Sequence, residues 1–138
     1  MGARTSGREA ALQMLFALEV SGDPAEAVIR RFWQSFEGQP ESKEYAEACV
    51  RGVTAALERV DGLVREASLH WRLERMTRVD RNVLRVGAWE LLERHDVPRA
   101  VILDEAVEMA KRFGTEESGP FVNGVLDRVA DNLGRKDR

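Results

Sequence analysis

Apolar side chains recur along this chain every three or four residues, which is the spacing of a helix that buries one face. The strict alternation typical of a half-buried strand is scarce. Glycine, proline and helix-capping residues interrupt the apolar period at short intervals, so each segment is predicted to be a separate short helix. The pattern predicts an all-α fold of about seven helices, which begin at Ser6, Pro24, Ser42, Leu63, Thr77, just after Pro98, and at about Pro120. The fourth is predicted to end at Trp71.

Several of these helix boundaries have a specific chemical basis. Ser6 with Glu9, and Thr77 with Asp80, have the spacing of a capping box, in which the hydroxyl accepts from the backbone N–H three residues on. Gly114 follows the sixth helix, where a left-handed residue commonly ends a helix. Residues 135–138 are expected to form a frayed basic tail. Short helices with tight connections favour a helical bundle of two sub-bundles that share one core.

The size and composition of the chain fit one globular domain, residues 1–138. Apolar residues make up 43% and charged residues 33%, so the chain can bury a core. No apolar run reaches the roughly 18 residues of a membrane span. The N-terminus is polar and does not resemble a signal peptide. These features predict a cytoplasmic protein that does not contact a membrane.

The sequence offers little chemistry for catalysis. Its two histidines, His70 and His95, lie near predicted helix ends, where histidine commonly complements the helix dipole. Cys49 lies on an apolar stripe, and no glycine-rich phosphate loop follows a strand. We therefore predict a binding protein and no enzyme, with no metal and no cofactor. Glu90 and Glu105 lie in strongly apolar helices and are expected to be buried polar groups paired between helices.

Positive charge gathers in two places although the net charge is −3. Arg78, Arg81 and Arg85 have the i, i+3, i+7 spacing of one helix face, and the preceding segment adds Arg72 and Arg75. The N-terminal segment supplies Arg4 and Arg8. A basic ridge of this kind fits a solvated helix face as well as a nucleic-acid surface, and composition alone does not decide between the two.

The junction before the seventh helix carries the strongest local signal. Lys111 and Arg112 close the sixth helix, a short polar loop follows, and a helix N-terminus attracts phosphate through its backbone N–H groups. Phe121 could stack on an unpaired base, and Asn123 can both donate and accept. Packing explains the same residues equally well, since Phe121 could be core and Asn123 could brace the loop.

Several segments of the chain resemble the NusB family of bacterial transcription antitermination factors. The similarity covers nearly the whole chain and is strongest from Val79 to Arg128. The segments that carry it are Arg8-Glu9-Ala10 with Leu15-Phe16, Val83-Leu84-Arg85 with Trp89-Glu90-Leu91, Asp104-Glu105-Ala106-Val107-Glu108-Met109-Ala110-Lys111, and Phe121-Val122-Asn123-Gly124-Val125-Leu126-Asp127.

The resemblance implies a NusB-like fold of two roughly perpendicular sub-bundles. It implies binding to boxA RNA of ribosomal RNA leader transcripts together with NusE, a ribosomal protein, within an RNA polymerase antitermination complex. A homodimer is left open, because some members self-associate through their RNA surface. Asp80 would face NusE, and Asn123 joins Glu90 and Glu105 as a buried structural polar residue. The predicted RNA-binding residues are Arg4, Arg8, Phe16, Arg81, Arg85, Lys111, Glu117, Ser118 and Phe121.

Two other functions remain as alternatives. NusB-like domains also precede the catalytic part of certain ribosomal RNA cytosine methyltransferases, although no cofactor domain follows Leu133 in this chain. A protein-only helical adaptor is the second alternative. Binding to boxA-type RNA, measured with and without NusE, separates these hypotheses.

Overall fold

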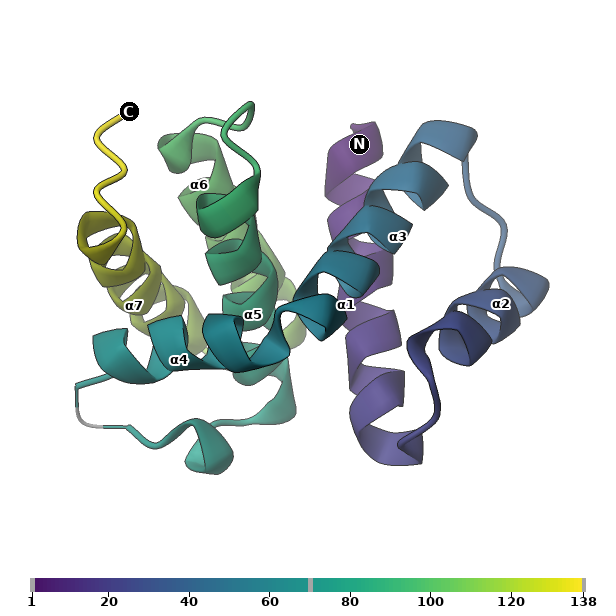
Figure 1. Cartoon of the computed structure of the whole chain (residues 1–138), viewed down its shortest axis with the longest axis horizontal. Helices are drawn as coiled ribbons and strands as arrows, with labels where there is room; N and C mark the ends of the chain where they lie inside the picture. The colour runs from purple at the N-terminus through teal and green to yellow at the C-terminus, as the bar shows by residue number, and fades with distance from the viewer. Residues whose placement is uncertain (1, 70, 138) are drawn as a thin grey trace. The chain divides into compact units, whose positions relative to one another are not determined.

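A computed structural model of the chain describes residues 2–69 and 71–137. Over these residues it contains helices and no strands, which confirms the predicted all-α class. The chain divides into two compact units, one ending at Ala55 and the other starting at Ala56 (Figure 1). The first unit contains α1 (Ala3–Ser21), α2 (Ala25–Ser35) and α3 (Pro40–Ala55); the second contains α4 (Leu57–Ala67), the 3₁₀ helix η1 (Leu73–Arg75), α5 (Arg78–Glu93), α6 (Arg99–Phe113) and α7 (Ser118–Asn132).

The first unit is built on the packing of α1 against α3. A side chain at Gly7 would place its Cβ only 2.9 Å from the Ser42 carbonyl oxygen and 3.0 Å from the Tyr45 Cβ, so a glycine lets the two helices approach closely. Arg51 on α3 joins α2 to this pair, because its Nε and Nη2 each donate to Glu26 at 2.9 Å. The core residues of the unit include Ala11, Met14, Leu15, Val28, Ile29, Ala46, Cys49, Val50 and Val53.

The second unit is organised around α5 and α7, each of which contacts every other α-helix of the unit. Figure 1 shows α5, α6 and α7 running alongside one another, with α4 lying across them. A Cβ at position 87 would lie 2.5 Å from Leu126 Cδ1. The absence of a side chain at Gly87 therefore leaves room for Leu126 of α7 against α5. The core residues include Val60, Val64, Val83, Leu84, Leu91, Ile102, Leu126 and Val129.

The helix boundaries test the predicted caps. Thr77 caps α5 as expected, since its hydroxyl accepts from the Asp80 backbone N–H at 3.1 Å. The predicted capping box at Ser6 is wrong, because α1 already begins at Ala3 and the Ser6 N–H donates to the Gly2 carbonyl at 3.0 Å. Ser6 therefore lies within the helix, where its backbone follows the α1 ladder.

Three further helices differ from their predicted extents. The third begins at Pro40, two residues before the predicted cap Ser42. The fourth spans Leu57–Ala67 instead of Leu63 to Trp71, because an exposed Gly62 is tolerated within it and Ser68 ends it. The seventh begins at Ser118, two residues before the predicted start at Pro120. Proline is compatible with the first turn of a helix, so Pro120 continues that turn instead of opening it.

Gly114 ends α6 without the predicted left-handed conformation. Its φ of −104° and ψ of −151° describe extended backbone. The need for glycine is instead one of space, because a Cβ would lie 2.7 Å from the Ala110 carbonyl oxygen and would also meet the Ser118 hydroxyl. The prediction placed glycine correctly at the helix end but gave the wrong physical reason.

The predicted frayed tail is wrong for residues 135–137. Gly134 adopts φ 73° and turns the chain back. Arg135 is then buried, where Nη1 donates to the Leu91 carbonyl at 3.0 Å and Nη2 to the Val97 carbonyl at 2.8 Å. Hydrogen bonds from Arg135 and from the backbone N–H of Arg99 hold the pKa of Asp137 well below its ordinary value. The C-terminal segment is thus fastened to α5 and to the loop before α6.

A buried ion pair joins α4 to α5. Arg85 Nε lies 2.8 Å from Asp61 Oδ1, and Nη2 lies 3.0 Å from Oδ2, with side chains only 12% and 11% exposed. Asn82 accepts a third bond from Arg85 Nη1 at 3.2 Å. Bidentate geometry with additional hydrogen bonds is what allows a charged pair to be buried without a large net penalty.

We expect Arg135→Ala to lower the free energy of unfolding by about 2 kcal/mol, because two buried carbonyl oxygens lose a charged donor. Urea denaturation followed by circular dichroism measures this change. Lys136→Ala is the matched control, because this substitution also removes one positive charge but at an exposed side chain. Equal stability of the two variants would contradict the anchored tail.

We expect Arg85→Met to cost about 3 kcal/mol of stability, because it leaves the Asp61 carboxylate buried without its cation. Adding Asp61→Leu should restore part of the loss, since the double variant no longer buries an unpaired charge. Urea denaturation of the two single variants and the double variant gives the coupling energy. Strict additivity would show that the pair does not act as a unit.

Candidate nucleic-acid interface

The junction of α6 and α7 places positive charge beside the first turn of α7. Lys111 and Arg112 are exposed in the last turn of α6. The Lys111 side chain lies over Gly119, where an added Cβ would be 3.4 Å from Lys111 Cγ. The N-terminal end of a helix also carries a partial positive charge. Lys111 Nζ also lies 3.7 Å from Glu108 Oε1, and the exposed Glu116 and Glu117 follow in the same loop, so cations and carboxylates stand together at this junction.

Phe121 lies one turn into α7 and is half-buried. It is therefore neither a fully buried core residue nor a fully exposed stacking residue, the two interpretations that the sequence allowed. Its ring centroid lies 6.1 Å from that of Trp71, at an interplanar angle of 76°. Packing against Trp71 fixes the ring, and the remaining exposure leaves part of it accessible. Trp71 itself is 58% exposed. Sequence reasoning missed this tryptophan by assigning it to the end of the fourth helix.

Two predicted residues of the junction have different environments from those expected. Ser118 is buried, and its hydroxyl accepts from the Thr115 backbone N–H at 3.0 Å, so it closes the loop and does not face outward. Asn123 is exposed, which contradicts the prediction that it is a buried structural residue, because its position on α7 faces away from the core. Glu117, the residue that precedes α7, is exposed as the RNA-facing prediction requires.

The two predicted buried glutamates also differ from each other. Glu90 is 1% exposed and lies in the last turn of α5, as expected for a buried structural carboxylate. Glu105 is only half-buried, because its position on α6 lies at the edge of the buried face. Each of the two side chains has an interaction partner within the structure.

The N-terminal cations divide into one exposed and one buried residue. Arg4 is exposed, whereas Arg8 is 2% exposed, and their guanidinium carbons lie 5.0 and 5.2 Å from the centroid of the Tyr45 ring. Cation–π contact stabilises both charges at this ring. Burial makes Arg8 a structural residue of α1 and contradicts its prediction as an accessible RNA contact. Phe16 is partly exposed on α1, as that prediction requires.

The predicted basic ridge along the fifth helix is also divided. Arg72, Arg75 and Arg78 are exposed. Arg81 turns inward, where Nη1 donates to the carbonyls of Leu73 and Met76 at 3.3 and 3.0 Å. Arg85 is held by Asp61 in the buried pair, so its guanidinium is engaged within the fold. Helical spacing placed these arginines on one face correctly, but that face is partly covered.

Asp80, predicted to face NusE, is half-buried in the first turn of α5. Its Oδ1 is buried and accepts no hydrogen bond from the described residues. A buried acceptor without a donor is costly.

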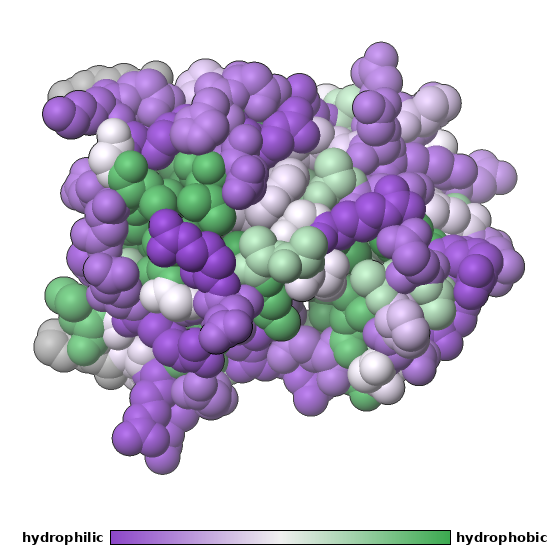
Figure 2. Space-filling model, viewed as in Figure 1, coloured by the Kyte–Doolittle hydropathy of each residue, from purple (hydrophilic) through white to green (hydrophobic). Residues whose placement is uncertain are grey.

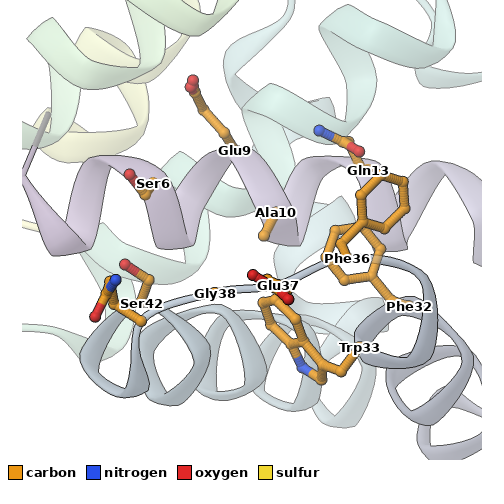
Figure 3. A pocket seen from close by; sticks show the side chains of 11 residues that line it. Ser6, Glu9, Ala10, Gln13, Phe32, Trp33, Phe36, Glu37, Gly38 and Ser42 are labelled. Atoms are coloured by element: carbon orange, nitrogen blue, oxygen red, sulfur yellow. The ribbon is translucent and has the colours of Figure 1, made fainter.

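A pocket of about 590 Å³ lies in the first unit and was not predicted. Figure 3 shows Phe32, Trp33 and Phe36 on one side of it, with Glu9 and Gln13 projecting from α1. The Phe32 and Phe36 rings stack at 4.7 Å, and Trp33 meets Phe32 edge to face at 4.8 Å. The aromatic cluster stabilises the end of α2, and nothing in its surroundings indicates a ligand.

The remaining candidate residues do not form a catalytic or metal site. Cys49 is buried in the core, as predicted, and His95 is exposed just after α5. His70 lies outside the described residues. Across residues 2–69 and 71–137, histidine, cysteine and carboxylate side chains form no cluster able to hold a metal ion.

The face of the molecule shown in Figure 2 is predominantly polar, with apolar areas between the polar side chains. Among the described residues, each helix is too short or too polar to cross a bilayer.

Comparisons of the sequence with known proteins agree on one family. The sequence model of the NusB family matches residues 5–131. The transcription antitermination protein NusB of Sorangium cellulosum is 65% identical over 138 residues, covering 100% of this chain and 99% of that protein. NusB of Myxococcus xanthus is 45% identical, with 98% and 99% coverage.

Solved structures agree with the fold. NusB of T. maritima superposes with a TM-score of 0.84 at 39% identity, over 93% of this chain and 90% of that one. A chain from a crystal structure of antitermination factors NusB and NusE in complex with dsRNA has a TM-score of 0.85 at 23% identity, over 96% and 98% of the two chains. The family match spans most of the chain and the identities extend over its whole length. This chain therefore belongs to the NusB family.

Proposed function

We propose that this chain acts in transcription antitermination by binding boxA RNA of ribosomal RNA leader transcripts together with NusE. The observation that carries the proposal is the α6–α7 junction, where Lys111 lies beside the first turn of α7 and Phe121 is partly exposed one turn further on. A phosphate is attracted to the cation and the helix N-terminus, and an unpaired base stacks on the ring. The role is one of binding, without a catalytic step.

The relatives support the same proposal. The 65% identical relative is a transcription antitermination protein, and a structural neighbour is bound to NusE and dsRNA. The full-length match to antitermination proteins favours this function over an RNA-binding domain of a methyltransferase. We place the protein in the cytoplasm, in an RNA polymerase antitermination complex.

The charge distribution gives NusE a physical role. This chain has a net charge of −3, and Arg8, Arg81 and Arg85, three of the five cations predicted to bind RNA, are engaged within the fold. In the first unit we assign Arg4 and Phe16 to RNA, and in the second unit we assign Lys111 and Glu117. A basic partner would supply the missing phosphate contacts, because affinity for RNA depends on the number of phosphates neutralised. RNA binding should therefore be weak alone and stronger with NusE.

We expect Lys111→Ala to weaken binding to single-stranded boxA RNA and to reduce the slope of log K against log salt by about 0.7, the contribution of one phosphate contact. Fluorescence anisotropy of labelled RNA, measured from low to high salt with and without NusE, gives both quantities.

Lys136→Ala is the charge-matched control, because Lys136 lies beside Arg99 at the opposite end of α6. An unchanged salt slope in Lys111→Ala would remove this lysine from the interface. Absence of specific RNA binding by the native chain, both alone and with NusE, would refute the proposed function and favour a protein-only adaptor.

A further inference from the structure

Trp71 stands out because a large aromatic side chain is exposed within a well-anchored segment. Trp71 is 58% exposed, although it follows the end of α4 by only four residues. Its contact with Phe121 is edge to face, a geometry that occupies one face of one ring and only the edge of the other. Ring faces therefore remain available at this pair, which joins the α4–η1 connection to the first turns of α7.

The backbone around Trp71 is held in place on both sides. The Arg128 Nε of α7 donates to the Ala67 carbonyl at 2.7 Å, and the Ser68 hydroxyl donates to the Val64 carbonyl at 2.7 Å. The Trp71 N–H donates to the Ser68 carbonyl at 3.2 Å. Leu73, two residues later, is buried in the core. The chain is thus anchored at Ala67 and Ser68 before Trp71 and at Leu73 after it.

The charge around the aromatic pair favours a polyanion. Arg65 and Arg72 line the same groove as Trp71, which has a volume of about 530 Å³. The carboxylate of the groove, Glu74, is paired with Arg65 at 3.3 Å. Lys111, whose Nζ lies 3.7 Å from Glu108 Oε1, lies over Gly119, two residues before Phe121. Arg72 therefore borders the Trp71 ring, and Lys111 lies near the start of the helix that carries Phe121.

We propose that Trp71 and Phe121 form one base-stacking platform for single-stranded RNA, with Arg72 contacting the phosphates that follow. Aromatic faces bordered by arginine and lysine are the arrangement that binds unpaired bases, whereas a purely apolar protein partner would gain nothing from the flanking cations. The inference rests on the proposed function and extends the RNA path from the α6–α7 junction to the α4–η1 connection.

Stacking and phosphate contact are distinguished by their salt dependence. Trp71→Ala should weaken RNA binding about tenfold, the effect of losing one stacked base, without altering the salt slope. Trp71→Phe should restore most of the affinity because it keeps a ring face. Arg72→Ala should instead lower the salt slope by about 0.7. Anisotropy titrations of labelled single-stranded boxA RNA against the full chain, at several salt concentrations and with NusE present, measure all three.

Phe36→Ala is the matched control, since Phe36 is an exposed aromatic residue of the first unit and should leave RNA affinity unchanged. Circular dichroism checks that each variant is folded. RNA should also quench tryptophan fluorescence in the native chain and quench it much less in Trp71→Phe, which retains Trp33 and Trp89.

The outcomes separate the platform from the broader proposal. The platform is overturned if the native chain binds RNA and the Trp71 variants keep full RNA affinity and unaltered quenching. That result would leave the proposed function intact. A second result would also overturn the platform: Trp71→Ala binds NusE more weakly in the absence of RNA while its RNA affinity is unchanged. Trp71 and Phe121 would then form a protein contact. Failure of the native chain to bind RNA overturns both.

Discussion

The close approach of α7 to α5 at Gly87 is the constraint on which the second unit depends. The Leu126 methyl groups occupy the space that any side chain at position 87 would need. This contact sets the position of α7, and with it the places of Phe121, Gly119 and the Arg128 bond to Ala67. A larger residue at position 87 would shift the helix that carries the proposed RNA contacts, so packing and recognition depend on the same pair of helices.

Arginine has two separate uses in this protein. Arg81, Arg128 and Arg135 donate to backbone carbonyls near helix ends, where the last carbonyls have no partner within their own helix. Arg85 is neutralised by Asp61 within the fold. The cations that we assign to RNA are Arg4, Arg72 and Lys111, all of which are exposed. A count of positive residues therefore overstates how much charge can face RNA.

A weak electropositive surface suits a protein that binds RNA together with a basic partner. Aromatic rings give affinity for unpaired bases that does not depend on net charge, and the few exposed cations set the position of the backbone. The anchored C-terminal segment and the buried ion pair hold the helices that present these groups. Rigid placement matters here because each individual contact is weak.

The sequence by itself determined the helical class, the cap at Thr77, the burial of Glu90 and Cys49, and the family, because helical period, local capping and family motifs depend on residues close together in the chain. Only the tertiary structure decided which arginines are engaged, that Ser118 is buried and Asn123 exposed, and that Trp71 meets Phe121. These depend on contacts between residues far apart in sequence, such as Arg135 with Leu91 and Arg85 with Asp61. Spacing assigns a residue to a helix face, but the neighbouring helix decides whether that face meets solvent.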